Sequence, residues 1–187
     1  MSISPVKRLI LETMWVLDKP TKATEIAKDT GVSFPSVMMH IIGLTRLGYA
    51  EIPEKGLYAI SDKGKKTLGL PEIDKSKATE ILAYLPVEKS FHFYADYGKA
   101  LNVHAASLQD FAEKINTIDL SSVEFHTQRG DFEAWFNGLG DVELARKTLL
   151  IREQKMVGEE LRKKLHAIVK SRVEDLAKIR KQIDISA

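Results

Sequence analysis

The feature that most constrains the fold is a pair of adjacent helical patterns separated by a glycine turn. Apolar residues at helical intervals predict a short helix over residues 23–29 and a longer one over residues 33–47. Thr30 and Gly31 form the turn between them, Ser33 is placed to cap the longer helix, and Gly48 ends it. The first helix can therefore brace the second across a tight connection.

The residues around this pair predict the rest of a small domain. A first helix begins near Pro5, where a missing N–H costs nothing, and ends before Pro20. After the helix pair, residues 49–52 and 57–60 are short β-type runs joined by a turn of hairpin length. Ser61 then caps a short helix rich in lysine. The expected order is three helices, a hairpin and a short helix.

A break in the pattern divides the chain. Residues 68–76 combine glycine, charge and Pro71, which cannot continue a helix, so we expect a linker there. The predicted domains are residues 1–70 and 77–187. The second is predicted to be all-α, with a long terminal helical segment that begins at Asp141, is divided at Gly158 and runs to about Gln182. Residues 90–97 are either a strand or a buried irregular segment.

Composition limits the classes of protein. With 44% hydrophobic and 29% charged residues in 187, the chain can form a globular core. It contains no apolar run long enough to cross a bilayer and no signal-peptide pattern, so we expect a cytoplasmic protein without membrane contact. The absence of cysteine excludes disulfides, thiol catalysis and cysteine-based zinc sites, and no motif indicates a cofactor.

Charge is distributed unevenly between the two parts. Residues 1–77 contain 12 Lys and Arg against 9 Asp and Glu, whereas residues 78–187 contain 16 against 17. The excess of three positive charges in the first part mildly favours a nucleic-acid partner there, although a solvated mixed surface explains the difference almost as well.

The helix over residues 33–47 has two distinct sides. Val37, Ile41, Leu44 and Leu47 recur at helical intervals and are predicted to pack on the domain. The opposite side presents small and polar groups near the start of the helix, which permit close approach to a partner and leave backbone N–H groups that can meet phosphate. These residues are Ser33, Ser36, Met39, His40 and Gly43.

Three segments together resemble the winged helix-turn-helix transcription regulators of the MarR, ArsR and PadR kinds. They are EIAKDTGVSFPSV (residues 25–37), LTRLGYAEI (44–52) and YAISDKGKKTL (58–68), and the resemblance covers residues 5–70. It implies a mainly α fold with a small hairpin wing, and duplex DNA as partner. Mapped onto this sequence, it implies base-edge contacts at Ser33, Pro35, Ser36, Met39 and His40, phosphate contacts at Lys22 and Thr24, a wing tip at Lys55, and backbone reach from Arg46.

The sequence departs from that family at Met38 and Met39, where arginine or lysine is common. No arginine on this part of the helix can make the bidentate guanine contact. Base readout then rests on van der Waals contact and DNA shape, or the module binds protein instead.

Residues 86–165 resemble an uncharacterised domain family seen mostly in archaeal proteins, which implies no activity. Its segments are PVEKSFHFY, HAASLQDFAEKI, SVEFHTQRGDFEAWF and LGDVELA. His92, His104 and His126 fit no metal-ligand spacing, so a buried histidine bonded to a carboxylate is the expected arrangement, with Arg129 and Asp131 as an ion pair or a cap. Aromatic residues nearby are predicted to be core: Phe125, Phe132, Trp135 and Phe136.

An apolar stripe in the last helical segment needs a partner. It comprises Leu161, Leu165, Ile168, Val169, Val173, Leu176 and Ile183, and Leu11 with Trp15 forms another in the first helix. We expect a homodimer held mainly by the C-terminal helices; the alternative is that both stripes pack within one chain.

The predicted function is a DNA-binding regulator of transcription, without metal or catalytic residues. One alternative is a protein-interaction adaptor with the same fold, which predicts no salt-dependent affinity for DNA. Another is an enzyme with an accessory winged helix, which predicts a polar pocket with converging histidine and carboxylate groups in residues 86–165. The sequence does not identify an operator or an effector.

Overall fold

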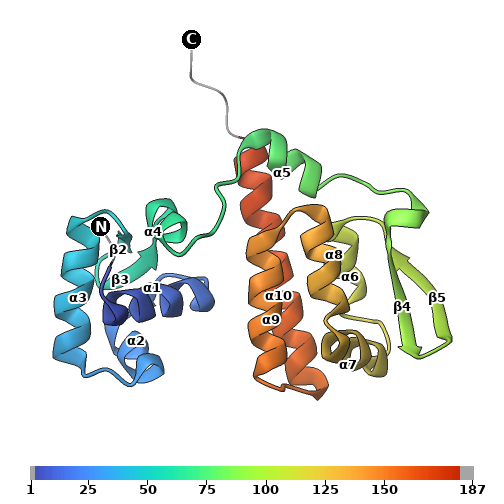
Figure 1. Cartoon of the computed structure of the whole chain (residues 1–187), viewed down its shortest axis with the longest axis horizontal. Helices are drawn as coiled ribbons and strands as arrows, with labels where there is room; N and C mark the ends of the chain where they lie inside the picture. Colours follow the sequence, from blue (N-terminus) through green and yellow to red (C-terminus); the bar gives the residue numbers. More distant parts are fainter. Residues whose placement is uncertain (1–2, 182–187) are drawn as a thin grey trace, which may run out of the picture. The chain divides into compact units, whose positions relative to one another are not determined.

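A computed structural model describes residues 3–181 of the chain. The protein is mainly helical, with two small antiparallel sheets (Figure 1). It divides into two compact units, residues 1–72 and 73–187, with the boundary inside the 68–76 segment. In the part of the chain that the structure describes, no helix is long and apolar enough to cross a membrane.

Unit 1 contains helices around a three-stranded sheet with strand order β1-β3-β2. Its elements are α1 (Pro5–Leu17), β1 (Thr21–Lys22), α2 (Ala23–Thr30), α3 (Phe34–Arg46), β2 (Ala50–Glu54), β3 (Leu57–Ile60) and α4 (Asp62–Thr67). The element order confirms the mainly helical prediction for this region. The core is formed by side chains from the first three helices, namely Ile10, Leu11, Met14, Ile26, Val37, Ile41 and Leu44.

Local sequence explains where these elements begin and end. Pro5 lies in the first turn of α1. Gly31 ends α2 with a φ of +69°, a left-handed conformation that glycine adopts without steric cost. Ser33 precedes α3 as predicted, but its side chain makes no capping hydrogen bond. Pro53 lies at the irregularity in the β2–β3 pairing between Glu51 and Glu54, where a residue without an N–H is tolerated.

One expectation for the apolar residues of unit 1 was wrong. Leu47 is 48% exposed, because it follows the last turn of α3 instead of continuing its buried side. Leu11 has no exposed surface and Trp15 is buried too, which agrees with the alternative that this stripe packs within one chain. Leu9, by contrast, is 40% exposed.

Unit 2 packs helices around an aromatic core and a β-hairpin. Its elements are α5 (Lys75–Ile81), the 3-10 turn η1 (Val87–Lys89), β4 (Phe91–Asp96), β5 (Lys99–Ala105), α6 (Leu108–Lys114), α7 (Leu120–Arg129), α8 (Asp131–Leu139), α9 (Val142–Glu153) and α10 (Gly158–Lys181). Phe91 lies at the centre of the aromatic cluster, within 6 Å of the rings of Phe93, Phe111, His126, Phe132 and Trp135.

The prediction of an all-α second domain was wrong, because β4 and β5 form an antiparallel hairpin. Phe91 and Phe93 are buried while His92 and Tyr94 face outward, which is the period-two alternation of a strand. Gly98 supplies the turn with a φ of +71°. The second strand, KALNVHA, has little of this alternation in burial, and its sequence gave no sign of it.

Two helix starts in unit 2 are capped by an aspartate and not by a nearby serine. Asp74, and not Ser76, accepts the N–H of Lys77 at the start of α5. Asp119 caps α7, so Ser122 lies inside that helix, fully buried, with no hydrogen-bond partner for its hydroxyl among the described residues. The predicted cap at Ser61 is present, and Ser107 and Asp141 cap α6 and α9.

The apolar stripe of α10 packs within unit 2. Leu161, Leu165, Ile168, Val169 and Leu176 are buried in its core, and Val173 is partly buried against it. Helices α5, α6, α7 and α9 all contact α10. These residues therefore pack within one chain, which was the alternative to a dimer through this stripe. Gln182 and Ile183 lie outside the residues that the structure describes.

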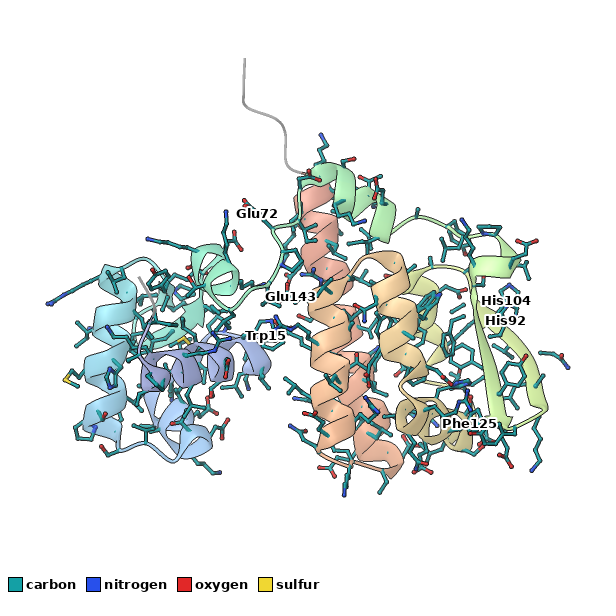
Figure 2. All side chains as sticks on the ribbon, in the orientation of Figure 1. Trp15, Glu72, His92, His104, Phe125 and Glu143 are labelled. Atoms are coloured by element: carbon teal, nitrogen blue, oxygen red, sulfur yellow. The ribbon has the colours of Figure 1, made fainter. Side chains whose placement is uncertain are left out.

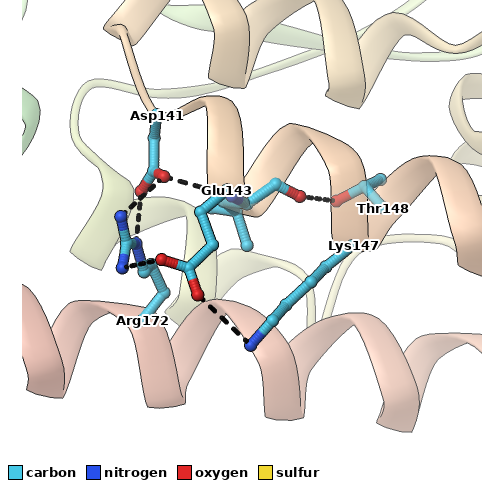
Figure 3. Close-up of polar contacts among 6 residues, drawn as sticks. Asp141, Glu143, Lys147, Thr148 and Arg172 are labelled. Carbon is cyan, nitrogen blue, oxygen red and sulfur yellow. Dashed lines mark hydrogen bonds and ion pairs between the residues drawn. The ribbon is translucent and has the colours of Figure 1, made fainter. Parts of the chain in front are cut away.

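A buried ionic network joins the start of α9 to α10 (Figure 3). The guanidinium of Arg172 donates to both carboxylate oxygens of Asp141, at 2.8 and 3.0 Å, and to Glu143 at 2.8 Å. Lys147 lies 3.9 Å from the other oxygen of Glu143. Asp141 also caps α9, so a single carboxylate ties the helix start to the neighbouring helix.

Candidate functional site

The residues predicted on α3 differ in how far they reach into solvent. Met39 is 62% exposed, and Ser33 and Pro35 are exposed at the start of the helix. Ser36 and His40 are half-buried on one flank of the helix. This outward face is therefore less polar than the sequence pattern implied.

Three of the predicted residues outside α3 meet at one hollow. Lys22, Thr24 and Lys55 line a cavity of about 520 Å³ together with residues of α3 and β3, among them Phe34, Met38 and Tyr58. Strand pairing explains the convergence: Lys22 is opposite Leu57 and Thr21 is opposite Tyr58, so the start of α2 is held beside the Lys55-Gly56 turn. The structure thus brings together the α2 start, the hairpin and the first turns of α3.

Arg46 does not belong to this hollow. It is exposed at the last turn of α3, and the helix separates it from Phe34 by about 18 Å along its axis. It remains available to a partner long enough to follow the whole helix, but it is not part of the Lys22–Lys55 cluster.

Several residues of this surface were missed by the sequence analysis. Phe34, 47% exposed, and Ile42, 45% exposed, add apolar surface to α3. Phe34, Met38 and Ile42 recur every four residues, which is a helical spacing. Met38 and Ile42 directly follow the buried Val37 and Ile41, so this second apolar series was hidden by the core pattern. Lys7 of α1 was also missed. Its side chain lies against Gly43, where an added Cβ would be 3.5 Å from the Lys7 Nζ. No spacing in the sequence indicates that contact.

A second cavity, of about 340 Å³, lies in unit 2 beside the hairpin turn. It is lined by aromatic rings, including Tyr94, Tyr97 and Phe125, and by His126, Arg129 and Asp131. Phe125, predicted as core, is half-buried at this cavity, whereas Phe132 and Phe136 are fully buried as predicted. Figure 2 shows Phe125 near the end of the hairpin opposite to His92 and His104.

His126 is held as a neutral ring. Its Nε2 accepts the backbone N–H of Tyr94 at 2.8 Å, so the proton is on Nδ1, which donates to Oδ2 of Asp131 at 2.7 Å. Burial lowers the pKa of His126, and the opposing influence of Asp131 does not restore it. The predicted histidine–carboxylate pair and the predicted Arg129–Asp131 ion pair, at 2.9 Å, are both confirmed.

This cavity contains the histidine and carboxylate groups that the enzyme alternative predicts, but His126 is poorly placed for proton transfer. Both ring nitrogens are already bonded to the chain itself. Arg129 is also engaged, through Nε with Asp131 and through its guanidinium stacked 4.8 Å from the centre of the Tyr97 ring. The groups that line the cavity thus satisfy one another.

The remaining histidines of the hairpin pair across the two strands. His92 and His104 are opposite one another with ring centroids 5.5 Å apart, and Nε2 of His92 is bonded to the carbonyl of Val87 at 2.8 Å. Among the described residues, no group of three or more histidine and carboxylate side chains is arranged to hold a metal ion.

Comparison with known proteins gives no relative: no protein-family model, no curated protein and no solved structure matches the chain. What the protein does must therefore be inferred from its own residues.

Proposed function

We propose that the chain is a cytoplasmic winged helix-turn-helix regulator that binds duplex DNA, with α3 in the major groove. Hairpin β2–β3 serves as the wing, and the start of α2 contacts the phosphate backbone. The observation that carries this proposal is the convergence of Lys22, Thr24 and Lys55 around one hollow beside the first turns of α3. Separate segments of the chain supply these groups, as a backbone-positioning contact requires.

The dimensions and charge of this surface support the proposal. An α-helix fits the width of the B-DNA major groove, and flanking lysines neutralise phosphates on either side of it. Lys22 and Lys55 both lie at the hollow beside the first turns of α3, and the positive excess of the chain lies in residues 1–77. A two-fold homodimer would read paired half-sites. The apolar stripe of α10 is buried in unit 2 and so is not free to form the dimer interface. Light scattering tests whether the chain forms a dimer by another surface.

The test is the salt dependence of DNA affinity. The full chain is titrated into a random-sequence duplex pool at several salt concentrations, as wild type and as the variant Lys22→Glu/Lys55→Glu. If both lysines contact phosphates, the slope of log K against log salt falls by about 2, and affinity at low salt falls with it.

A matched control separates this effect from net charge. Two reversals in unit 2, Lys99→Glu and Lys178→Glu, change the net charge equally at side chains that are 70% and 76% exposed. This control should keep the wild-type slope. Absence of binding by the wild-type chain at low salt and tens of micromolar protein would contradict the proposal, because non-specific DNA binding is normally detectable there.

The exposed apolar groups of α3 favour a second candidate, a protein-binding adaptor. Three exposed apolar side chains lie on this helix, Phe34, Met39 and Ile42, and hydrogen bonding to base edges would not use them. The adaptor would use the same helix but would show no salt-dependent affinity for duplex DNA. The titration above therefore distinguishes the two functions.

A further inference from the structure

The outer ridge of α3 consists of Pro35, Met39, Ile42 and Arg46, which follow one another at three- and four-residue intervals. Met39 is 62% exposed and Ile42 is 45% exposed, and Pro35 and Arg46 are exposed as well. The half-buried Ser36 and His40 lie to one side, next to Gly43 and Lys7. The first three ridge residues carry no side-chain donor, and their sole side-chain acceptor is the weakly accepting thioether of Met39.

This chemistry limits what the ridge can recognise in a major groove. Base edges there present donors and acceptors, and a side chain must supply a matching group to read them. The thymine C5-methyl is the apolar group in that code, and it is read by apolar contact. We therefore infer that the outer ridge selects sites with thymine methyl groups facing Pro35, Met39 and Ile42; this rests on the proposed DNA-binding function.

The size of the ridge sets the number of methyl groups. Residues 35–42 span about 10 Å of helix, which corresponds to about three base pairs. A ridge of this length can cover about two methyl groups. Burying one methyl-sized group favours binding by about fourfold, so two give about a fifteenfold preference.

The experiment removes the methyl groups and leaves the phosphates unchanged. Affinity of the full chain is measured at one salt concentration for poly(dA-dT), for poly(dA-dU), which lacks only the thymine methyls, and for poly(dG-dC). We expect about fifteenfold tighter binding to poly(dA-dT) than to poly(dA-dU).

Variants of the ridge assign the preference to its residues. Met39→Ala/Ile42→Ala should bring the ratio of the two affinities close to one. Both side chains are exposed and alanine favours helix, so α3 should persist. Leu47→Ala is the matched control, since Leu47 is 48% exposed at the end of the same helix and out of phase with the ridge; it should keep the ratio.

The outcomes separate the inference from the proposed function. Equal affinity of the wild-type chain for poly(dA-dT) and poly(dA-dU) overturns the inference and leaves DNA binding intact. A preference that survives in Met39→Ala/Ile42→Ala, or that Leu47→Ala abolishes equally, overturns the assignment to the ridge. Absence of binding to all three polymers removes the proposed function, and the inference with it, in favour of a protein partner.

Discussion

His126 is a residue whose protonation is coupled to the folding of unit 2. In the folded chain its ring is neutral, because protonation of Nε2 would remove the acceptor for the N–H of Tyr94. Asp131 lies five residues after His126, so the sequence could suggest this pair, since a buried histidine is usually bonded to a carboxylate. The bond from Tyr94 was not, because it comes from a strand 32 residues away.

This arrangement predicts a pH dependence. The folded-state pKa of His126 lies below the ordinary histidine value of about 6.5, so above that pH the ring is mostly neutral in both the folded and the unfolded chain. As the pH falls below about 6.5, only the unfolded chain takes up the proton, and the free energy of unfolding of unit 2 decreases. We expect urea unfolding to show this loss when it is followed by Trp135 fluorescence in a Trp15→Phe background, since Trp15 belongs to unit 1.

His126→Gln serves as the reference for that measurement. The variant is less stable at neutral pH, because it loses buried hydrogen bonds, but its stability should change less between pH 7 and pH 5. His92 and His104 remain in both proteins, so the difference between the two pH profiles isolates His126. Parallel profiles would contradict the assignment.

Among the helices, α4 depends on a close approach of two backbones. Gly64 lies against the carbonyl of Tyr49, and a Cβ added there would overlap that oxygen and the side chain of Ile60. The carbonyl cannot easily withdraw, since it accepts the N–H of Ser61 at 3.1 Å. The end of α3 and the start of α4 are thus joined through a position where only glycine fits.

Gly64→Ala should therefore destabilise unit 1, although alanine is the better helix former. We expect a loss of about 1–3 kcal/mol in the free energy of unfolding, the usual cost of overpacking. Lys66→Ala in the same helix is the control, because that side chain is 73% exposed. A gain in stability for Gly64→Ala would show that α4 can move away from Tyr49.

The elements differed in how far sequence could predict them. Helix α3 was predictable because its buried residues recur at helical spacing between Ser33 and Gly48. Strand β5 was not, because its side chains do not alternate and it depends on pairing with β4. The hollow at Lys22 and Lys55 was predicted only as separate contacts, since strand pairing between β1 and β3 brings them together.

At the scale of the whole molecule, each unit has its own core. The buried cluster of unit 2 is built from residues between Ala78 and Leu176, and the first three helices of unit 1 bury a separate set. Arg172 is essential to unit 2, because its removal leaves Asp141 and Glu143 buried without a cation at those oxygens. Disruption of one core should therefore leave the other folded.

Arg172→Ala tests this independence. Breaking a buried ionic network by removing one partner costs about 3–5 kcal/mol, so hydrogen exchange should accelerate throughout residues 73–181. The amides of Ile10, Ile41 and Leu44 should keep their protection. Arg180→Ala, an exposed position of α10, should change neither unit. Loss of protection in both units together would show that they unfold as one.

The pairing of β1 with β3 has a consequence for how a partner is met. Because Lys22 and the Lys55 turn belong to one hydrogen-bonded sheet, the spacing between their backbone positions is set when the chain folds. The backbone freedom of both segments is lost at that stage and not during association. A partner whose anionic groups lie within reach of both side chains therefore needs to order only the two lysine side chains, and not the backbone that carries them.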